Sequence, residues 1–151
     1  LVYHNQVPIE QSFIDPEWGR LQAEAMMEDD VDVIFAAAGS TGNGALLAIA
    51  ERADSGVMGI GVDTDQYTTL VEAQPILLSS STKQVDVGLL DILKAIDAGT
   101  VEGGNFYGSI GLAPFHDFED RIPADVKQTL SELEAQLKAG EVEIVIPTPT
   151  P

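Results

Sequence analysis

Apolar residues in this chain fall into two patterns, continuous runs and runs of helical spacing, which follow each other along the sequence. The continuous run VDVIFAAA at 31–38 is typical of a parallel strand covered on both faces. Asp15 before Pro16 predicts the N-cap and first residue of a helix. The expected strands are 1–6, 31–38, 57–63, 75–82, 105–115 and 141–147. The expected helices cover 16–30, 45–53, 85–98 and 123–139.

This order of strands and helices predicts an α/β fold with a mainly parallel sheet flanked by helices. Ligands of such sheets bind beyond the carboxyl ends of the strands. Three clusters of glycine or polar residues follow apolar runs at such ends, at 39–44, 63–66 and 79–83. We therefore expect the binding site at this edge of the sheet.

The first cluster, GSTGNG, allows two interpretations. Small residues let backbone N–H groups approach a ligand at the start of a helix, but a tight turn also needs glycine torsions. Three glycines in six residues favour the ligand role. No lysine follows the last glycine, so the cluster is not a P-loop. Asp63 lies 19 residues after Gly44, as in a dinucleotide-binding fold, yet the glycine order is G-x-x-G-x-G.

Asp63 ends the second long apolar run, where its carboxylate can accept two hydrogen bonds from the neighbouring hydroxyls of a sugar. The alternative is a turn residue. Lys83 ends the next strand at the same edge and is expected near Asp63, either paired with it or donating to a ligand. Asp65 is expected to have a structural role.

The aromatic and histidine residues suggest binding rather than catalysis. Phe13 precedes the first long helix, where its ring can stack on a planar base. Trp18 is expected in the core, His4 in a strand and His116 in a loop. The two histidines have no metal-ligand spacing and no catalytic partner, so we predict no metal site and no enzyme.

Charge and composition limit the kinds of partner and chemistry that the chain can have. Asp and Glu number 25 against 7 Lys and Arg, a net charge of −18, which argues against a nucleic-acid partner. The chain has no cysteine, which removes disulfides and thiol catalysis. No apolar run reaches the roughly 20 residues of a membrane span.

Taken in order, IFAAAGSTGNG, GIGVDTDQ and SSSTKQVDVG resemble the basic membrane protein (BMP) family of ABC-importer solute-binding proteins, which includes purine nucleoside receptor lipoproteins. SFIDPEWGRLQAEAM and GSIGLAPFHD are also similar to segments of that family. The resemblance implies a type I periplasmic-binding fold, whose two α/β lobes close on the ligand by a hinge. It makes 1–151 the C-terminal portion, with 1–74 and 105–151 mainly in one lobe and 75–104 contributing to the other.

The same resemblance implies that Phe13 stacks on a nucleobase, that Gly39 touches the ligand, and that Asp63 and Lys83 bind the ribose hydroxyls. It implies a nucleoside ligand, no cofactor, an ABC permease as partner, an N-terminal lobe absent from this chain, and a place outside the cytoplasm, with any lipoprotein anchor upstream. Two alternatives stay open: a Rossmann-type NAD(P) oxidoreductase domain and a ligand-sensing regulatory domain of the same fold.

Overall fold

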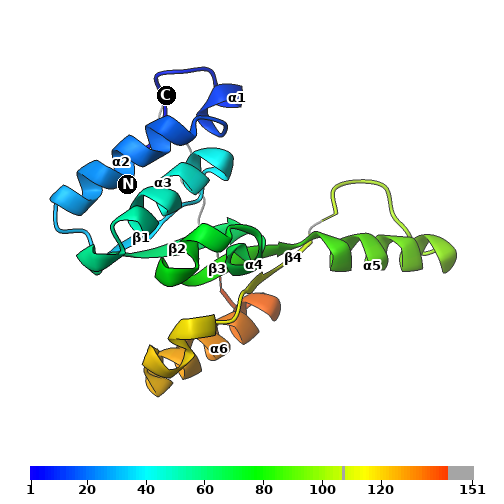
Figure 1. Ribbon diagram of the computed structural model, residues 1–151. Helices are drawn as coiled ribbons and strands as arrows, with labels where there is room; N and C mark the ends of the chain where they lie inside the picture. Colours follow the sequence, from blue (N-terminus) through cyan, green and yellow to red (C-terminus); the bar gives the residue numbers. More distant parts are fainter. Residues whose placement is uncertain (107, 143–151) are drawn as a thin grey trace. The chain divides into compact units, whose positions relative to one another are not determined.

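A four-stranded sheet organises the first part of the chain in the computed structural model, which describes residues 1–106 and 108–142 (Figure 1). The order is β1-β2-β3-β4, with the first three strands parallel and the fourth antiparallel to β3. This confirms the predicted α/β class and mainly parallel sheet. The strands are β1 (Val33–Phe35), β2 (Met58–Asp63), β3 (Leu77–Gln84) and β4 (Ser109–Leu112).

The chain divides into two units, residues 1–117 and 118–151, and each is described by itself. The helices predicted at 16–30 and 85–98 lie close to their expected ranges, whereas the helix predicted at 45–53 begins six residues earlier, at Gly39. The N-cap prediction is confirmed, because the Asp15 side chain accepts a hydrogen bond from the Trp18 backbone N–H. The helices of the first unit are α1 (Ile9–Ser12), α2 (Pro16–Glu28), α3 (Gly39–Glu51), α4 (Gln66–Thr69) and α5 (Val85–Asp97), with short 3₁₀ turns η1 (Ala53–Ser55) and η2 (Val71–Ile76).

The core of this unit lies where α3 packs on β2 and η2. Its largest fully buried apolar side chains are Leu46, Ile49, Ile76 and Leu77. Helix α2 lies beside α3 (Figure 1) rather than directly on the sheet. The two helices approach so closely that a Cβ on Gly44 would lie 1.9 Å from the carbonyl oxygen of Pro16.

The predicted two-sided burial of β1 is wrong. Ile34 is buried, whereas its neighbours Val33 and Phe35 are 38% and 55% exposed. Alternate residues of a strand point to opposite faces, so only the face toward α3 is covered here. A continuous apolar run shows that both faces favour burial, but not that a second layer is present.

Several predictions near the N-terminus also need correction. Residues 1–6 form no strand, since no strand of the described sheet lies beyond β1 to pair with them. His4 therefore lies in a loop, where its ring stacks on Trp18 at 4.2 Å between ring centres. Trp18 is half-buried by this contact and is not part of the core cluster.

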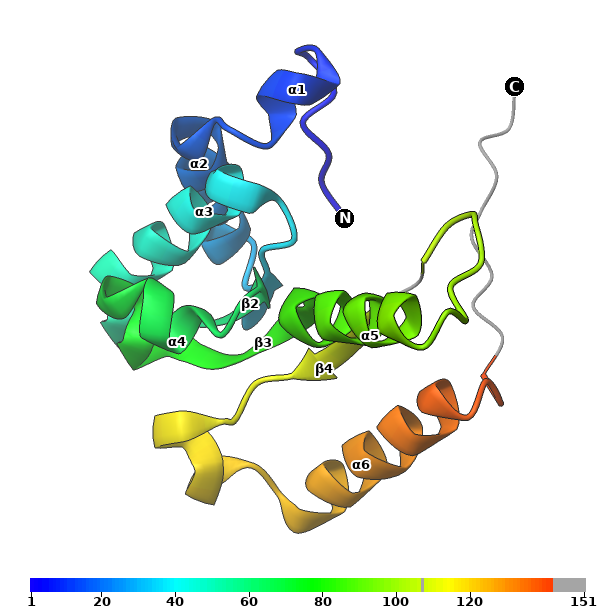
Figure 2. The same cartoon turned by 90° about the vertical axis from the view of Figure 1, so that its right-hand side faces the viewer.

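Helix α5 matches its predicted range but has few neighbours. It runs beside β4, away from α2 and α3 (Figure 2). Its apolar side chains stay exposed on more than one face: Val85, Val87, Leu89, Leu90, Leu93 and Ile96.

The second unit contains the predicted last helix, α6 (Ala124–Lys138), and the last four residues of the 3₁₀ segment η3 (His116–Arg121), which begins in the first unit. Phe118 is buried, and the Arg121 guanidinium lies 5.0 Å from the centre of its ring. The predicted strand at 141–147 lies almost wholly outside the described residues. Of the helices that the structure describes, none is both long and apolar enough to cross a lipid bilayer.

Candidate functional site

Two of the three clusters predicted to form the site lie at the carboxyl ends of β1 and β2, whereas the third, at 79–83, lies within β3. The register of the ladder places Asp63, the last residue of β2, beside Thr82, which lies two residues before the end of β3. Helix α3 starts four residues after the end of β1. The polar residues therefore gather at the edge where a parallel sheet commonly binds ligands.

The glycine cluster is not a turn before a helix, because α3 already begins at Gly39. A Cβ on Gly42 would lie 2.3 Å from the Ala36 carbonyl oxygen, as close a conflict as that of Gly44 with α2. These two glycines are thus required for tight packing against neighbouring backbone. The presence of Gly42 and Gly44 is therefore explained without a ligand.

Gly39 and Phe13, two of the predicted site residues, lie together. Gly39 has a φ of +57°, and a Cβ there would lie 2.9 Å from the Phe13 carbonyl oxygen. That oxygen accepts hydrogen bonds from the Ser40 hydroxyl at 3.0 Å and from the Thr41 backbone N–H at 3.3 Å. The start of α3 thus holds the Phe13 backbone, while the side chain stays 49% exposed and free to stack on a planar group.

Asp63 and Lys83, the other two predicted residues, form an ion pair across β2 and β3. Oδ1 of Asp63 lies 2.6 Å from Nζ of Lys83, and both side chains are partly exposed. The angles between the two groups are not those of a hydrogen bond, so buried Oδ1 has a charge partner but no donor among the described residues. Asp63 also has a φ of +71°, a left-handed conformation that is uncommon outside glycine.

A buried glutamine that the sequence did not single out joins all three clusters. Gln66 is 7% exposed, and its amide Nε2 donates to Oδ1 of Asn43 at 2.7 Å. Its Oε1 accepts from the backbone N–H of Val62 at 2.9 Å, and its own N–H donates to the Ser80 hydroxyl at 3.1 Å. The one sequence signal for this contact is Gly61, whose absent side chain makes room for the amide.

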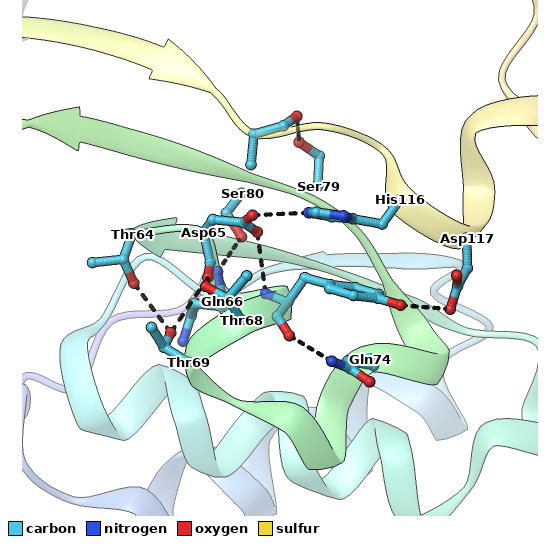
Figure 3. A network of polar contacts seen from close by, with 12 residues as sticks. Thr64, Asp65, Gln66, Thr68, Thr69, Gln74, Ser79, Ser80, His116 and Asp117 are labelled. Atoms are coloured by element: carbon cyan, nitrogen blue, oxygen red, sulfur yellow. Dashed lines mark hydrogen bonds and ion pairs between the residues drawn. The ribbon is translucent and has the colours of Figure 1, made fainter.

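Beside this glutamine, Asp65 has the structural role expected of it. It caps α4 by accepting from the Tyr67 N–H, and its Oδ2 lies 2.8 Å from Nε2 of His116 (Figure 3). The Tyr67 ring stacks on His116, and its hydroxyl donates to Asp117. The hydrogen bond to the Asp117 carboxylate raises the pKa of Tyr67 above its usual value. This set fastens residues 116–117 to the end of β2.

A similar contact fixes the loop before α2. The Asp15 carboxylate accepts from the Trp18 N–H, and its Oδ2 lies 3.1 Å from Nε2 of His4. The hydrogen bond from Trp18 and then that from His4 lower the pKa of Asp15. His4 and His116 thus have aromatic and carboxylate partners that stabilise loops.

The predicted residues therefore form two contacting pairs, Phe13 with Gly39 and Asp63 with Lys83. Within residues 1–106 and 108–142 no hydrogen bond or ion pair joins one pair to the other. In the same ranges, no group of three or more His, Asp and Glu side chains is arranged to hold a metal ion. The groups at the sheet edge can accept and donate hydrogen bonds and stack on a ring.

Comparison with known proteins gives a family match. Residues 6–109 match the sequence model of the family described as "ABC transporter substrate-binding protein PnrA-like". The chain is 31% identical over 149 residues to the CD4+ T-cell-stimulating antigen of Listeria monocytogenes serovar 1/2a, covering 87% of this chain and 41% of that protein. It is 34% identical over 143 residues to basic membrane protein A of Borreliella burgdorferi, covering 91% and 40%.

Solved structures share the fold. An ABC transporter system solute-binding protein from Aeropyrum pernix K1 matches with a TM-score of 0.69 at 23% identity, over 88% of this chain and 45% of that one. A transcriptional activator of the comK gene from Bacillus halodurans matches with a TM-score of 0.64 at 23% identity, over 81% and 42%. The chain spans about two fifths of the length of the relatives it matches.

Proposed function

Since this chain belongs to the family of PnrA-like ABC-transporter substrate-binding proteins, we propose that it forms one wall of a site that captures a nucleoside or related riboside. The ion pair of Asp63 and Lys83 at the carboxyl edge of the sheet carries the proposal. Although its Oδ1 is buried, the Asp63 side chain is 46% exposed, so its carboxylate can accept hydrogen bonds from the hydroxyls of a ribose, and the neighbouring Lys83 ammonium can donate to the same hydroxyls.

Phe13 and Gly39 supply the remaining part of this wall. An exposed aromatic ring presents a flat apolar face to a purine or pyrimidine base. Gly39 lies beside Phe13 at the first position of α3, where the partial positive charge of the helix start favours ligand oxygens. The ligand is held without a cofactor and without catalysis.

The opposite wall belongs to a second lobe. We assign 1–74 and 105–151 mainly to one lobe and 75–104 to a contribution to the other. The exposed apolar side chains of α5, inside 75–104, support this assignment because a helix of a globular protein normally buries such a face. Ligand between the lobes favours their hinge closure, and the closed form is what an ABC permease recognises.

The place of action follows from the same role. A protein that delivers a solute to an importer works outside the cytoplasm, in the periplasm or tethered as a lipoprotein to the outer face of the cell membrane. The partners are then a small riboside and the permease subunits, and nucleic acid is disfavoured by the net charge of −18.

Nuclear magnetic resonance titration of the ¹⁵N-labelled chain tests the ligand. We expect inosine, guanosine or adenosine to shift the amide signals of Gly39, Asp63 and Lys83, with weak affinity because half a site cannot exclude water from both sides. The 2′-deoxy form of the same nucleoside should bind at least about fivefold more weakly, since it lacks one of the hydroxyls that Asp63 accepts.

Asp63→Asn should reduce binding of the ribonucleoside to the level of the deoxy form. Asp54→Asn, at an exposed acid in η1, is the matched control, because it removes the same charge away from the site. The nucleoside assignment would be wrong if none of the three compounds shifts these signals at about 10 mM in a folded chain.

A further inference from the structure

The buried side chain of Gln66 occupies a place where a strand would otherwise continue. The ladder between β1 and β2 ends at the pair Phe35 and Ile60, followed by one bond from the Ala36 N–H to the Ile60 carbonyl. Alternate residues of a strand direct their backbone groups to the same side, so the Val62 N–H faces the side that β1 has left. Oε1 of Gln66 accepts this N–H at 2.9 Å, in place of a strand.

The other end of the same amide fixes α3. Nε2 of Gln66 donates to Oδ1 of Asn43 at 2.7 Å, one turn after Gly39. A single planar group thus sets the distance between the start of α3 and the last residues of β2. Asp63 follows Val62 directly and has a left-handed backbone conformation. The direction of the Asp63 side chain therefore depends on how firmly the Val62 backbone is held.

The residues packed around the Gln66 side-chain amide hold it in a single orientation. A Cβ on Gly61 would lie 2.5 Å from Oε1 of Gln66 and 2.6 Å from the Ser80 hydroxyl. The Gln66 backbone N–H donates to that same hydroxyl, and Ser80 is fully buried in β3. The glutamine is therefore held from β2, β3 and α3 at once, and losing its amide would leave the Val62 N–H without an acceptor.

We propose that Gln66 is the positioning residue of the site: it couples the Gly39 end of α3 to Asp63 without itself touching the ligand. This inference rests on the proposed function for what the two groups bind, but the coupling between them is a property of this chain alone. If Gln66 only stabilised the fold, replacing it would not shift the amide signals of Gly39 and Asp63 together.

Gln66→Met tests the proposal, because methionine keeps the length of the side chain and removes both hydrogen bonds. Without any nucleoside, we expect the Val62 amide to exchange with solvent about tenfold faster, and the amide signals of Gly39 and Asp63 to shift together. With inosine, guanosine or adenosine, binding should weaken about tenfold. Asn43→Ala should shift the same signals, and adding it to Gln66→Met should change little further, since Gln66→Met already breaks the bond between Gln66 and Asn43.

Two controls separate positioning from stability. Gln74→Met removes a glutamine whose Nε2 donates to the Tyr67 carbonyl, away from Gly39, and should leave the three amides unchanged. Ile49→Val lowers core stability and should leave nucleoside affinity unchanged. Unaltered Gly39 and Asp63 signals in Gln66→Met, or wild-type nucleoside affinity in that variant, would overturn the coupling. If the wild-type chain binds no nucleoside, the ligand assignment fails. The positioning role is then decided without ligand, by the exchange rate of the Val62 amide and by the amide signals of Gly39 and Asp63 in Gln66→Met.

Discussion

At the scale of single residues, the glycine segment shows how one pattern can have several causes. Gly42 and Gly44 are required by backbone neighbours at 2.3 and 1.9 Å, whereas Gly39 has a positive φ at the start of α3. The sequence singled out the segment but could not separate the roles of its glycines, because their close neighbours come from other parts of the chain. Gln66 escaped notice for the same reason, since its partners lie in α3, β2 and β3.

Gly44→Ala should destabilise the chain by about 1–3 kcal/mol, because the added methyl group forces α2 away from α3. The matched control is Gly88→Ala in α5, where the nearest atom is the edge of the Phe106 ring at 3.2 Å. There we expect a change between zero and a gain of about 1 kcal/mol from helix propensity. Urea unfolding followed by circular dichroism measures both, and equal losses in the two variants would contradict the packing explanation.

At the scale of elements, α5 combines an accurate sequence prediction with an unexpected environment. Its range follows from its apolar spacing, yet its apolar side chains are not buried in the unit to which it belongs. Together with β4 it borders an apolar groove of about 480 Å³, whose lining includes Leu89, Ile92 and Phe106. Helical periodicity shows that one face of a helix is apolar, but it does not show which surface packs against that face.

Leu89→Gln should change the free energy of unfolding by less than about 0.5 kcal/mol, because Leu89 is exposed and glutamine suits a helix equally well. It should also reduce binding of the dye ANS, which reports exposed apolar surface. Leu46→Ala, in the core of α3, is the control and should cost about 2–5 kcal/mol. A loss of several kcal/mol for Leu89→Gln, measured by urea unfolding, would mean that α5 is buried in solution.

At the scale of the whole molecule, the main feature is the excess of negative charge, which affects the stability of the fold. With 25 acidic and 7 basic side chains, the folded chain carries a net charge of −18, and like charges held close together oppose folding. The ion pairs of the surface relieve little of this, since exposed pairs contribute about 0–1 kcal/mol each. Asp63 with Lys83 is one of them, which is consistent with a role in binding rather than in stability.

Raising sodium chloride from about 10 to 150 mM should therefore increase the midpoint of thermal unfolding, because it shortens the Debye length from about 30 to 8 Å. Sodium bromide at the same ionic strength should give a similar increase, as expected for screening rather than a specific ion. A midpoint that stays constant or falls with salt would show that attractive pairs outweigh the overall repulsion.

The sequence by itself determined the α/β class, the parallel order of the main strands and most helix ranges. These follow from local periodicity, capping residues and turn residues, which act over a few positions. Only the tertiary structure decided that Phe13 lies against Gly39, that Asp63 pairs with Lys83, and that the side-chain amide of Gln66 bonds both β2 and α3. It also decided that β1 is covered on one face and that α5 stays exposed. Contacts of this kind depend on which segments, distant in the sequence, pack against each other. A periodic pattern shows only that one face of an element is apolar, not which segment covers it.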